Sequence, residues 1–391
     1  MNKKTLRLVL LAGTLWLIVV LLSASCKNIK IEPAAEKEPQ IPRYELTLIA
    51  AGDNLFHITI INNHRQRDGS YNFDPIYTEI KNIIQNADIA FINQETVMGG
   101  TELGYSGYPN FNTPQSLAYT LRDTGFDIIN LANNHAMDMG RSGLYNTLDL
   151  LDTIEEFTVI GARKNGEHFR LIRKNNITLG FLSYTYGLNG MPLPRDNPNA
   201  VSLINKTTMA QEIEELRPLC DFLVVSIHWG AEYRLIEPDN NQKDFAVFLA
   251  EQNVDLVIGH HPHVLQRVEL LPRPDGRQTL CYYSIGNFVS NQREKDRVLG
   301  GMMVVTFIKD GDSHSLYNQG MIPVITHFEA GYTNTKVHPY FSYTEDLLKK
   351  HLLYHSDSNM NFEYFRGVLD RLNTPIIMYN PFIRNNNSRR E

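Results

Sequence analysis

Five short apolar runs of this chain each end at a cluster of polar residues of metal-ligand type. The runs cover residues 46–50, 89–92, 128–132, 222–227 and 256–258. A short apolar run that is bounded by turn residues is typical of a buried strand. If these strands are neighbours, their polar ends emerge at the same edge of one sheet, where open α/β sheets place their ligands. The pattern therefore predicts a sheet with a functional site along one edge.

Segments with apolar residues at helical spacing lie between these runs. They cover residues 74–84, 116–122 and 245–251, and Pro75 stands at an early position where a helix tolerates proline. An aspartate enters four of the five strands, namely Asp88, Asp127, Asp221 and Asp255. The repeated order of helix, turn, strand and polar loop predicts an α/β fold with helices outside the sheet.

The composition is that of a globular chain and argues against nucleic acid as a partner. The 391 residues are enough for one large core, and 42% of them are hydrophobic while 20% are charged. The formal net charge is −6, and no basic stripe interrupts the sequence. Because a nucleic-acid-binding surface needs concentrated positive charge, we expect no nucleic-acid partner.

The N-terminus has the pattern of a secretory signal peptide over residues 1–25. Lys3, Lys4 and Arg7 precede an apolar run over residues 8–22, and small residues follow it. This run is short for a membrane-spanning helix, which needs roughly 20 apolar residues. We therefore expect the segment to direct export across a membrane.

Cys26 follows the small residues and resembles the lipidated cysteine of a bacterial lipobox, although Ser23 stands where that motif has leucine. Lipidation would make the protein an extracytoplasmic lipoprotein, held at a membrane through its N-terminal lipid. Plain cleavage and an uncleaved signal anchor remain open alternatives. The segment 26–43 contains prolines and alternating charges, and we expect it to be a tether that lifts the domain off the membrane.

The polar ends of the five runs contain carboxylate, amide and imidazole groups that together suit a divalent metal. The candidate ligands are Asp53, Glu95, Asn134, His228, His261 and His263. Each alone has a structural interpretation, such as a turn aspartate, a loop acid, a capping asparagine or a core histidine. Their shared position favours a metal site, and a mixed set without thiolate favours Mn, Fe or Zn. The set is large enough for one or two ions.

Further residues near the runs have expected roles beside the metal. His135 directly follows Asn134 and is expected to act on the substrate rather than on the metal. A supporting or substrate-contacting role is expected for Asn93, Asp138, Trp229, Glu232, His260 and Asn287. Among the scattered histidines only His57 is left open, and the others are interpreted as structural or surface residues. Cys220 and Cys281 are expected to be buried free thiols, with a disulfide as the alternative.

These motifs, in this order, resemble the CapA family of poly-γ-glutamate capsule biosynthesis proteins. The likeness covers roughly residues 46–289 and runs through Gly52-Asp53, Asn93-Gln94-Glu95, residues 133–140, His228-Trp229-Gly230 and residues 261–264, with further matches at 111–114, 147–148, 161–162 and 283–288. The resemblance implies the fold of the calcineurin-like metallophosphoesterases, a four-layer α/β/β/α sandwich. It also implies that the six candidate ligands form the metal set and that His135 stabilises or protonates a leaving oxygen.

The resemblance implies a role in capsule polymer synthesis or export, through an anionic polymer or phosphoester substrate and a membrane polymer-synthesis complex. Two departures from the wider superfamily bear on this role. Leu55 stands where its first motif has histidine, and Asn93-Gln94-Glu95 replaces its Gly-Asp-x-x-Asp motif. A metal-dependent hydrolase-type site is therefore weighed against a non-catalytic scaffold that has kept the fold. A general metal-dependent phosphoesterase unrelated to capsule is a further alternative.

The chain after the tether is expected to divide into two parts. A metallophosphoesterase-like domain covers residues 44–335, and a C-terminal helical extension with a polar tail covers residues 336–391. Residues 300–307 and 321–326 are predicted strands of a second sheet. Helices are predicted over residues 344–355 and 361–372. The loop over residues 96–114 is a candidate lid or substrate-contacting segment, with a flexible surface excursion as the alternative, and residues 184–199 are expected to form another long loop after a strand.

Overall fold

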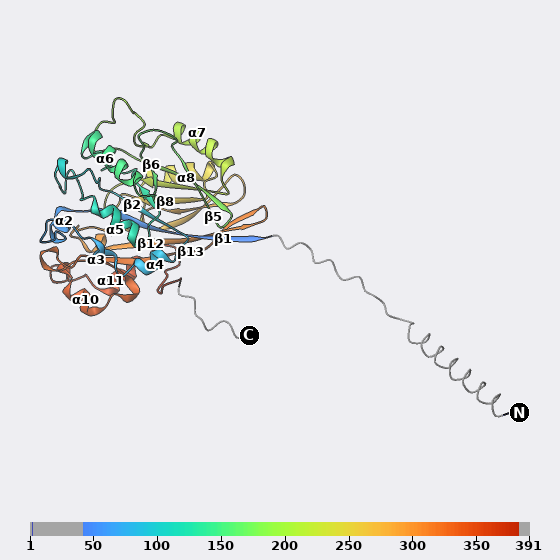
Figure 1. The fold of residues 1–391 in the computed structure, drawn as a ribbon. Helices are drawn as coiled ribbons and strands as arrows, with labels where there is room; N and C mark the ends of the chain where they lie inside the picture. The colour runs from blue at the N-terminus through green and yellow to red at the C-terminus, as the bar shows by residue number, and fades with distance from the viewer. Residues whose placement is uncertain (1, 3–41, 383–391) are drawn as a thin grey trace. The chain divides into compact units, whose positions relative to one another are not determined.

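The apolar runs build two β-sheets that face each other, with helices on their outer faces (Figure 1). The computed structural model describes residues 2 and 42–382. The described helices and strands all lie in one unit, Arg43–Glu391. Apart from residue 2, the predicted signal peptide, Cys26 and the tether up to residue 41 lie outside the described residues. Over residues 42–382, no helix is both long and apolar enough to cross a membrane.

The first sheet has eight strands. In spatial order they are β14 (Lys336–Pro339), β13 (Ser313–His327), β12 (Leu299–Asp310), β1 (Arg43–Asn54), β2 (Ile89–Gln94), β3 (Ile128–Asn130) and β4 (Thr158–Ile160), with β11 (Asn287–Val289) paired to the end of β1. From β1 to β4 the strands are parallel, whereas β12, β13 and β14 are antiparallel to their neighbours. The carboxyl ends of β1, β2 and β3 therefore lie at the same edge.

The second sheet has six strands. In spatial order they are β5 (Arg170–Lys174), β6 (Ile177–Thr185), β7 (Phe222–His228), β8 (Leu256–His260), β10 (Gln278–Tyr282) and β9 (Val268–Pro272). The four inner strands are parallel, and the edge strands β5 and β9 are antiparallel to them. The carboxyl ends of β7 and β8 thus also lie together.

Helices and short 3₁₀ turns cover the sheets. The α-helices are α2 (Ile58–Asn63), α3 (Asp74–Tyr77), α4 (Lys81–Gln85), α5 (Ser116–Thr124), α6 (Gly140–Asp152), α7 (Lys206–Leu216), α8 (Asn240–Glu251), α9 (Lys295–Val298), α10 (Glu345–Lys350) and α11 (Phe362–Leu369). The 3₁₀ turns are η1 (Thr101–Leu103), η2 (Arg217–Leu219), η3 (Ala330–Tyr332), η4 (Tyr340–Ser342) and η5 (Leu352–His355).

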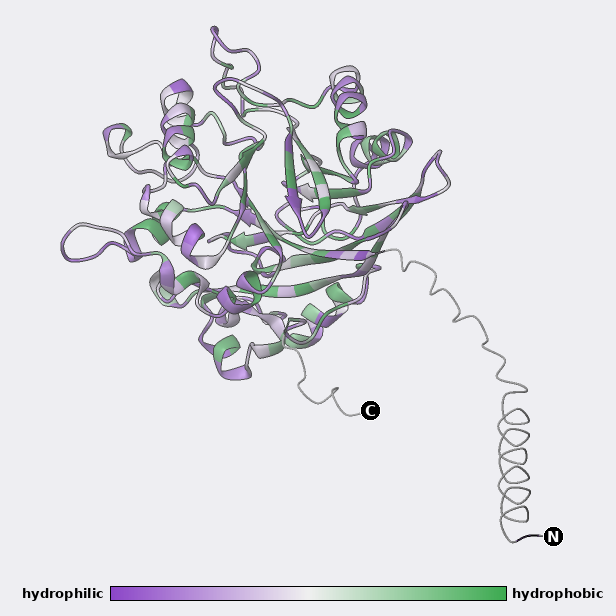
Figure 2. Ribbon diagram, turned by 45° about the vertical axis from the view of Figure 1, so that its right-hand side comes forward, coloured by the Kyte–Doolittle hydropathy of each residue, from purple (hydrophilic) through white to green (hydrophobic). Residues whose placement is uncertain are grey.

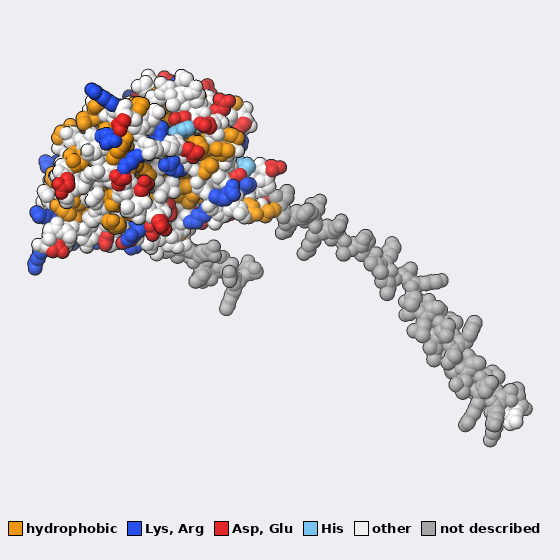
Figure 3. Space-filling model, turned by 45° about the horizontal axis from the view of Figure 1, so that its top comes forward, with side chains coloured by type: hydrophobic (Ala, Val, Ile, Leu, Met, Phe, Trp, Pro, Cys, Tyr) orange, Lys and Arg blue, Asp and Glu red, His pale blue; other side chains and the backbone are white. Residues whose placement is uncertain are grey.

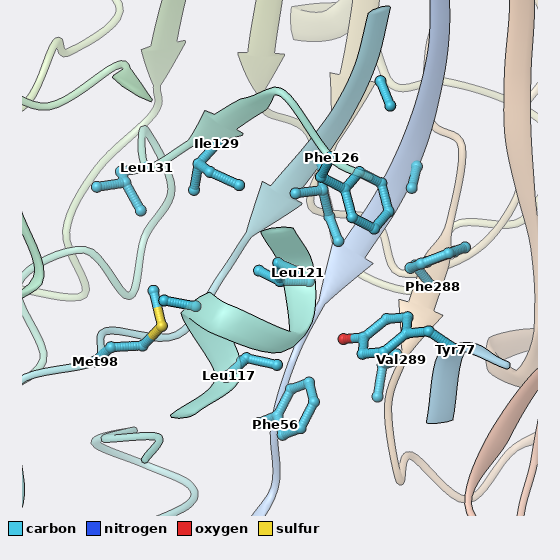
Figure 4. Close-up of a cluster of buried hydrophobic side chains, with 14 of the residues drawn as sticks. Phe56, Tyr77, Met98, Leu117, Leu121, Phe126, Ile129, Leu131, Phe288 and Val289 are labelled. Atoms are coloured by element: carbon cyan, nitrogen blue, oxygen red, sulfur yellow. The ribbon is translucent and has the colours of Figure 1, made fainter. Parts of the chain in front are cut away.

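Three hydrophobic clusters fill the three interfaces of a four-layer sandwich. The first packs α3 to α6 on the first sheet, and Figure 4 shows Leu117 and Leu121 of α5 in this cluster together with Phe126. The second lies between the two sheets and includes Phe91. The third packs α7 and α8 on the second sheet and includes Leu249. This layering confirms the predicted α/β/β/α architecture.

Colouring by hydropathy and by charge agrees with this layering. Figure 2 shows apolar segments concentrated in the strands and hydrophilic segments along the outer helices and loops. On the face shown in Figure 3, positive and negative side chains are interspersed. Burial of the strand side chains between layers is the main stabilising contribution, at about 25 cal/mol per Å² of apolar surface.

The aspartates at the strand entries each tie two neighbouring strands together. Each donates its backbone N–H to the carbonyl of one residue in the next strand, and its carboxylate accepts the N–H of that same residue. The carboxylate contacts are Asp88 to Thr47 (2.8 Å), Asp127 to Ala90 (2.7 Å), Asp221 to Thr178 (2.7 Å) and Asp255 to Leu223 (2.8 Å). The recurring aspartate therefore sets the start of the strand pairing.

The prediction that the five ligand-bearing strands share one sheet was wrong. β1, β2 and β3 lie in the first sheet, whereas β7 and β8 lie in the second. The later strands predicted over 300–307 and 321–326 belong to β12 and β13, which extend the first sheet. An apolar run that is buried on both faces looks the same in either sheet, so the run alone does not identify its hydrogen-bonded neighbour.

Two predicted helices are each divided into shorter pieces. The segment 74–84 forms α3 and α4, and the segment 344–355 forms α10 and η5. The second break falls at His351, whose backbone is extended (φ −61°, ψ 133°). Directly after the predicted boundary at residue 335, β14 pairs with β13, and side chains of α10 and α11 then join the core between the sheets.

Candidate metal centre

Loops at the carboxyl ends of strands from both sheets converge on one centre. Asp53 lies at the end of β1, Glu95 follows β2, and Asn134 lies in the loop after β3. His228 ends β7, and His261 and His263 follow β8. Because the two sheets face each other, the six predicted ligands meet between them. The sheets thus contribute different chemistry, with oxygen ligands from the first and imidazoles from the second.

Glu95 connects two overlapping groups of ligand atoms. Asp53, Glu95 and His263 each offer one atom within 4.8 Å of the others, and so do Glu95, His228 and His261. Oε1 of Glu95 lies 3.7 Å from Nε2 of His228 and 3.7 Å from Nε2 of His263. Glu95 therefore stands where a ligand shared by two neighbouring cations would be placed.

Asn134 joins this arrangement from the first sheet. Its Oδ1 lies 2.9 Å from Nε2 of His228, and its side chain is almost completely buried. Its Nδ2 donates to Oδ1 of Asn189 at 3.3 Å, which turns the amide oxygen toward the histidine. The structure thus brings all six predicted ligands together.

The residues present fit a divalent metal. Both carboxylate oxygens of Glu95 are buried without a hydrogen-bond partner among the residues that the structure describes, as are Nδ1 of His228 and Nδ1 of His261. An unpartnered buried carboxylate is costly, and a cation is the usual way to offset that cost. Carboxylate, amide and imidazole donors without thiolate suit a borderline divalent ion.

The electrostatics of the group around Glu95 also favour a bound cation. Burial, followed by the charge of Asp53, raises the pKa of Glu95 well above its usual value. Burial, followed by repulsion from neighbouring imidazoles, holds the pKa of His228 well below its usual value and lowers the pKa of His261 to about 3. The two imidazoles are therefore neutral, which is the form that binds a metal.

Asp53 is the anionic anchor of the centre. Its carboxylate accepts Nδ2 of Asn93 at 2.8 Å and the backbone N–H of His261 at 3.3 Å. Nδ1 of His260 and Nδ1 of His263 lie 3.3 Å and 3.1 Å from it. Burial alone would raise the pKa of Asp53, but these two histidines outweigh it and hold that pKa well below its usual value. His260 therefore lies behind the ligands, as predicted from its place in the motif.

The loop after β8 holds its two histidines in an unfavourable backbone conformation. His261 has φ +96° and His263 has φ +59°, values that side-chain-bearing residues rarely adopt. Oδ1 of Asn287 lies 3.0 Å from Nδ1 of His263, so this amide helps to fix the ring from behind. Strained backbone of this kind persists where the surrounding structure imposes it, most often at functional sites.

His135 is oriented by an acid rather than by the ligand group. Its Nδ1 lies 2.7 Å from Oδ2 of Asp138, and the edge of its ring packs on Phe111 with centroids 4.7 Å apart. The side chain is 8% exposed. Since Asp138 engages Nδ1, Nε2 remains the nitrogen that can exchange a proton with a substrate. Asp138 thus has the supporting place predicted for it.

Two other predicted residues differ in their placement. Trp229 does not face the centre: its Nε1 donates to the carbonyl of Tyr283 at 2.9 Å, within the cluster under α7 and α8. Successive side chains of an extended chain alternate in direction, so the residue after the inward-facing His228 turns outward. Glu232 is exposed at the rim, where its carboxylate comes within 4.8 Å of a nitrogen of His261 and of His263.

Several residues beside the centre were not predicted from the sequence. The ring of Tyr186 lies 4.6 Å from that of His261, and Nδ2 of Asn189 lies 3.3 Å from Nδ1 of His135. His57, whose role was left open from the sequence, is half-buried, and burial, with a contribution from His263, lowers its pKa to about 4. Tyr186 directly follows β6, so the strand-end rule could have found it. Tyr186 and Asn189 both lie in the predicted loop 184–199, but no cluster of acids or histidines there indicated a place at the centre.

The two facing sheets and a centre of imidazoles and carboxylates at their strand ends define a metallophosphoesterase-like class of protein. The sequence model of the family described as Bacterial capsule synthesis protein PGA_cap matches residues 47–292. The chain belongs to this family, and the predicted resemblance to the CapA proteins is confirmed.

Two curated relatives have names that agree with this family. The chain is 27% identical over 305 residues to Capsule biosynthesis protein CapA of Bacillus anthracis, covering 72% of this chain and 69% of the relative. It is 30% identical over 200 residues to PGA biosynthesis protein CapA of Bacillus subtilis, covering 49% of this chain and 50% of the relative. The match to the B. subtilis protein thus spans about half of each chain.

Solved structures with a similar arrangement are more distant. A phosphatase from Mycoplasma pneumoniae is 14% identical, with a TM-score of 0.44, and the match covers 73% of this chain and 95% of that protein. The NAD nucleotidase of Haemophilus influenzae is 12% identical, with a TM-score of 0.44, and the match covers 85% of this chain and 68% of that protein.

Proposed function

We propose that this protein uses one or two divalent ions to hydrolyse a phosphoester bond, or to transfer its phosphoryl group, during capsule or poly-γ-glutamate biosynthesis or export. The observation that carries the proposal is the buried, unpartnered carboxylate of Glu95, which stands between the imidazoles of His228 and His263. A buried carboxylate without a partner is costly, and a bound cation offsets that cost.

Each residue of the centre has a distinct proposed role. The residues that would hold the metal are Asp53, Glu95, Asn134, His228, His261 and His263. Manganese, iron or zinc bound there would supply Lewis acidity and an activated hydroxide. His135 would give a proton from Nε2 to the leaving oxygen, while Asp138 holds its other nitrogen. Asn93 and His260 would hold Asp53 in place, and Asn287 would hold His263 in place.

The proposed setting is the outer side of a bacterial membrane. The names of the relatives support a role in capsule polymer biosynthesis, and the N-terminal sequence pattern supports export with lipid attachment at Cys26. A membrane polymer-synthesis complex is the proposed partner. An anionic polymer or its phosphoester precursor is the proposed substrate class.

A non-catalytic scaffold is the second candidate function, and one residue favours it. Leu55 stands where the wider superfamily has a metal-binding histidine, and its side chain is buried and apolar. One ion position thus has one ligand fewer than in that superfamily. A scaffold that has kept the fold would tolerate this loss more readily than an enzyme.

Turnover of a phosphodiester and a phosphomonoester by the full-length protein distinguishes the two candidates. We expect bis-p-nitrophenyl phosphate or p-nitrophenyl phosphate to be hydrolysed with added Mn²⁺, and the activity to disappear with a chelator and in His261→Ala. His355→Ala is the matched control, because this histidine is exposed and belongs to the C-terminal segment. The absence of turnover in the metal-loaded wild type, or unchanged turnover in His261→Ala, would contradict the proposal.

A further inference from the structure

An arginine that is stacked on a tyrosine lies beside the candidate metal centre. The guanidinium carbon of Arg297 is 3.4 Å from the ring centroid of Tyr233. That ring lies 6.0 Å from the ring of His263, centroid to centroid. The ring of Tyr233 thus lies next to both the positive charge of Arg297 and the predicted metal ligand His263.

Both members of this pair are tied to the histidine loop. Nδ2 of Asn287 donates to the carbonyl of Arg297 at 2.9 Å, and the same amide supports His263 through its oxygen. The backbone N–H of Tyr233 donates to the carbonyl of Pro262 at 2.8 Å. The arginine and its platform are therefore placed by the same residues that place the ligand.

The backbone of Tyr233 is held in a conformation that needs a reason. It has φ +65°, which is uncommon for an aromatic residue, and its side chain is 41% exposed. An exposed aromatic ring gains little from burial, so the strained backbone is not explained by core packing. The strained backbone is explained if it serves to hold the ring, and the guanidinium above it, at a functional position.

The guanidinium keeps capacity for a further anion. Among the described residues it makes one ion pair, from Nη1 to Oε2 of Glu294 at 2.7 Å, and its side chain is 20% exposed. A guanidinium has five N–H donors in a fixed plane, so a single pair leaves donors for another partner. That plane matches carboxylate and phosphate oxygens, which it binds with two parallel hydrogen bonds.

We propose that Arg297, supported by Tyr233, binds an anionic group of the substrate that adjoins the reacting bond. The recognised chemistry is a carboxylate or a phosphate oxygen pair, so the favoured substrate carries a second negative charge beside the bond that reacts. The location of the reacting bond rests on the proposed function, whereas anion binding by Arg297 can be measured without turnover.

The experiment is calorimetric titration of the full-length, Mn²⁺-loaded protein with two probes, inorganic phosphate and a γ-linked glutamate trimer. We expect Arg297→Ala to weaken binding of at least one probe about 10- to 100-fold, as for loss of a charge-assisted hydrogen-bond pair. The affinity of Arg297→Lys should fall between those of the wild type and Arg297→Ala, because lysine supplies the charge without the planar arrangement of N–H donors. Metal content should be unchanged in both variants.

Arg122→Ala is the matched control. Arg122 lies over Tyr119, with its guanidinium carbon 5.5 Å from the ring centroid, and pairs with Asp123 at 2.7 Å, but it belongs to α5 on the surface. Its replacement should leave both affinities unchanged. A loss confined to phosphate identifies a phosphate group as the bound anion, and a loss confined to the trimer identifies a carboxylate.

Wild-type affinity for both probes in Arg297→Ala would overturn the proposal, as would equal weakening in Arg122→Ala or the absence of binding in the wild type. If Arg297→Ala does not fold, Arg297→Lys carries the test, and wild-type affinity in that variant has the same consequence. A missing phosphoesterase activity together with Arg297-dependent binding would contradict the proposed function and leave this inference standing.

Discussion

The pKa values of two neighbouring histidines of the centre are shifted in opposite directions. Burial and mutual repulsion lower the pKa of His261 to about 3. Burial would lower the pKa of His263 too, but the charges of Glu95 and Asp53 outweigh it and raise that pKa to about 9. In the absence of a cation, one imidazole therefore carries a proton while the other is neutral. A bound divalent ion would replace that proton, so metal binding should release it.

Substitution at the residue scale separates a ligand from a proton donor. His263→Ala should lose bound metal, because its ring lies within the group formed with Asp53 and Glu95. His135→Ala should keep metal and lose turnover by about 10²–10⁴, the usual worth of general acid catalysis. Metal content and phosphoester turnover are measured on the same preparations.

Asp138→Asn is the companion variant for His135. It keeps the size of the side chain but weakens the 2.7 Å contact that orients Nδ1 of His135. We expect a smaller loss of turnover than in His135→Ala, with metal retained. If His135→Ala empties the site as completely as His263→Ala does, His135 is a ligand and its assignment as the acid is wrong.

The sequence predicted the convergence of the candidate ligands better than the residues that surround them. Glu95 and the His261-Pro262-His263 segment follow apolar runs within two or three residues, so their position followed from the strand pattern. Tyr233 lies in the loop between β7 and α8, and Arg297 lies in the short helix α9. Only the folded chain brings the two residues together beside the centre. Residue spacing contains no information about such long-range neighbours.

At the scale of elements, the entry aspartates set strand pairing. Asp127 donates its N–H to the carbonyl of Ala90 and accepts the N–H of Ala90 at 2.7 Å. Asp127→Ala leaves that buried N–H without its partner, which typically costs about 1–3 kcal/mol. We expect the urea midpoint to fall accordingly.

Asp123→Ala is the control for this prediction. Asp123 makes an exposed ion pair with Arg122, and such pairs contribute about 0–1 kcal/mol. Its replacement should change the free energy of unfolding by less than half as much as Asp127→Ala. Equal losses in the free energy of unfolding for the two substitutions would show that the contact with Ala90 stabilises the strand pairing no more than an exposed ion pair does.

The order of strands is where the sequence was insufficient. Each apolar run predicted a strand, and the structure has a strand at each of them. The partition into sheets depends on which strands pair, and β12 pairs with β1 although most of the chain lies between them. Local periodicity indicates burial but does not identify the neighbouring strand. The five ligand-bearing strands were therefore expected in one sheet, whereas they divide between the two sheets of the sandwich.

The stability of the whole molecule should depend on pH through histidines outside the centre. His327, His338 and His351 lie together where β13 and β14 meet the C-terminal segment. Burial, followed by repulsion from His338, lowers the pKa of His327 to about 4, and burial lowers the pKa of His351 to about 3. These groups are neutral when folded and would bind protons when unfolded.

The sign of the effect follows from these lowered values. Burial of these neutral histidines does not reduce the stability of the folded state above pH 6.5. As the pH falls through 6.5 toward the folded pKa values, the unfolded chain binds protons that the folded chain does not, and the free energy of unfolding decreases. Each histidine can contribute up to about 2 kcal/mol of destabilisation between pH 7 and pH 5. Urea unfolding at both pH values should show a smaller pH dependence in His351→Gln than in the wild type, and an unchanged one in His355→Gln. An unchanged pH dependence in His351→Gln would contradict this account.

The central claim is that the facing strand ends hold metal, and elemental analysis of the purified full-length protein tests it most directly. We predict about one to two divalent ions per chain after loading with Mn²⁺, falling below about half of the wild-type content in Glu95→Gln. Glu102→Gln, at an exposed position, should retain the wild-type content. A folded wild type that binds no divalent ion, or a Glu95→Gln variant with wild-type metal content, would contradict the account.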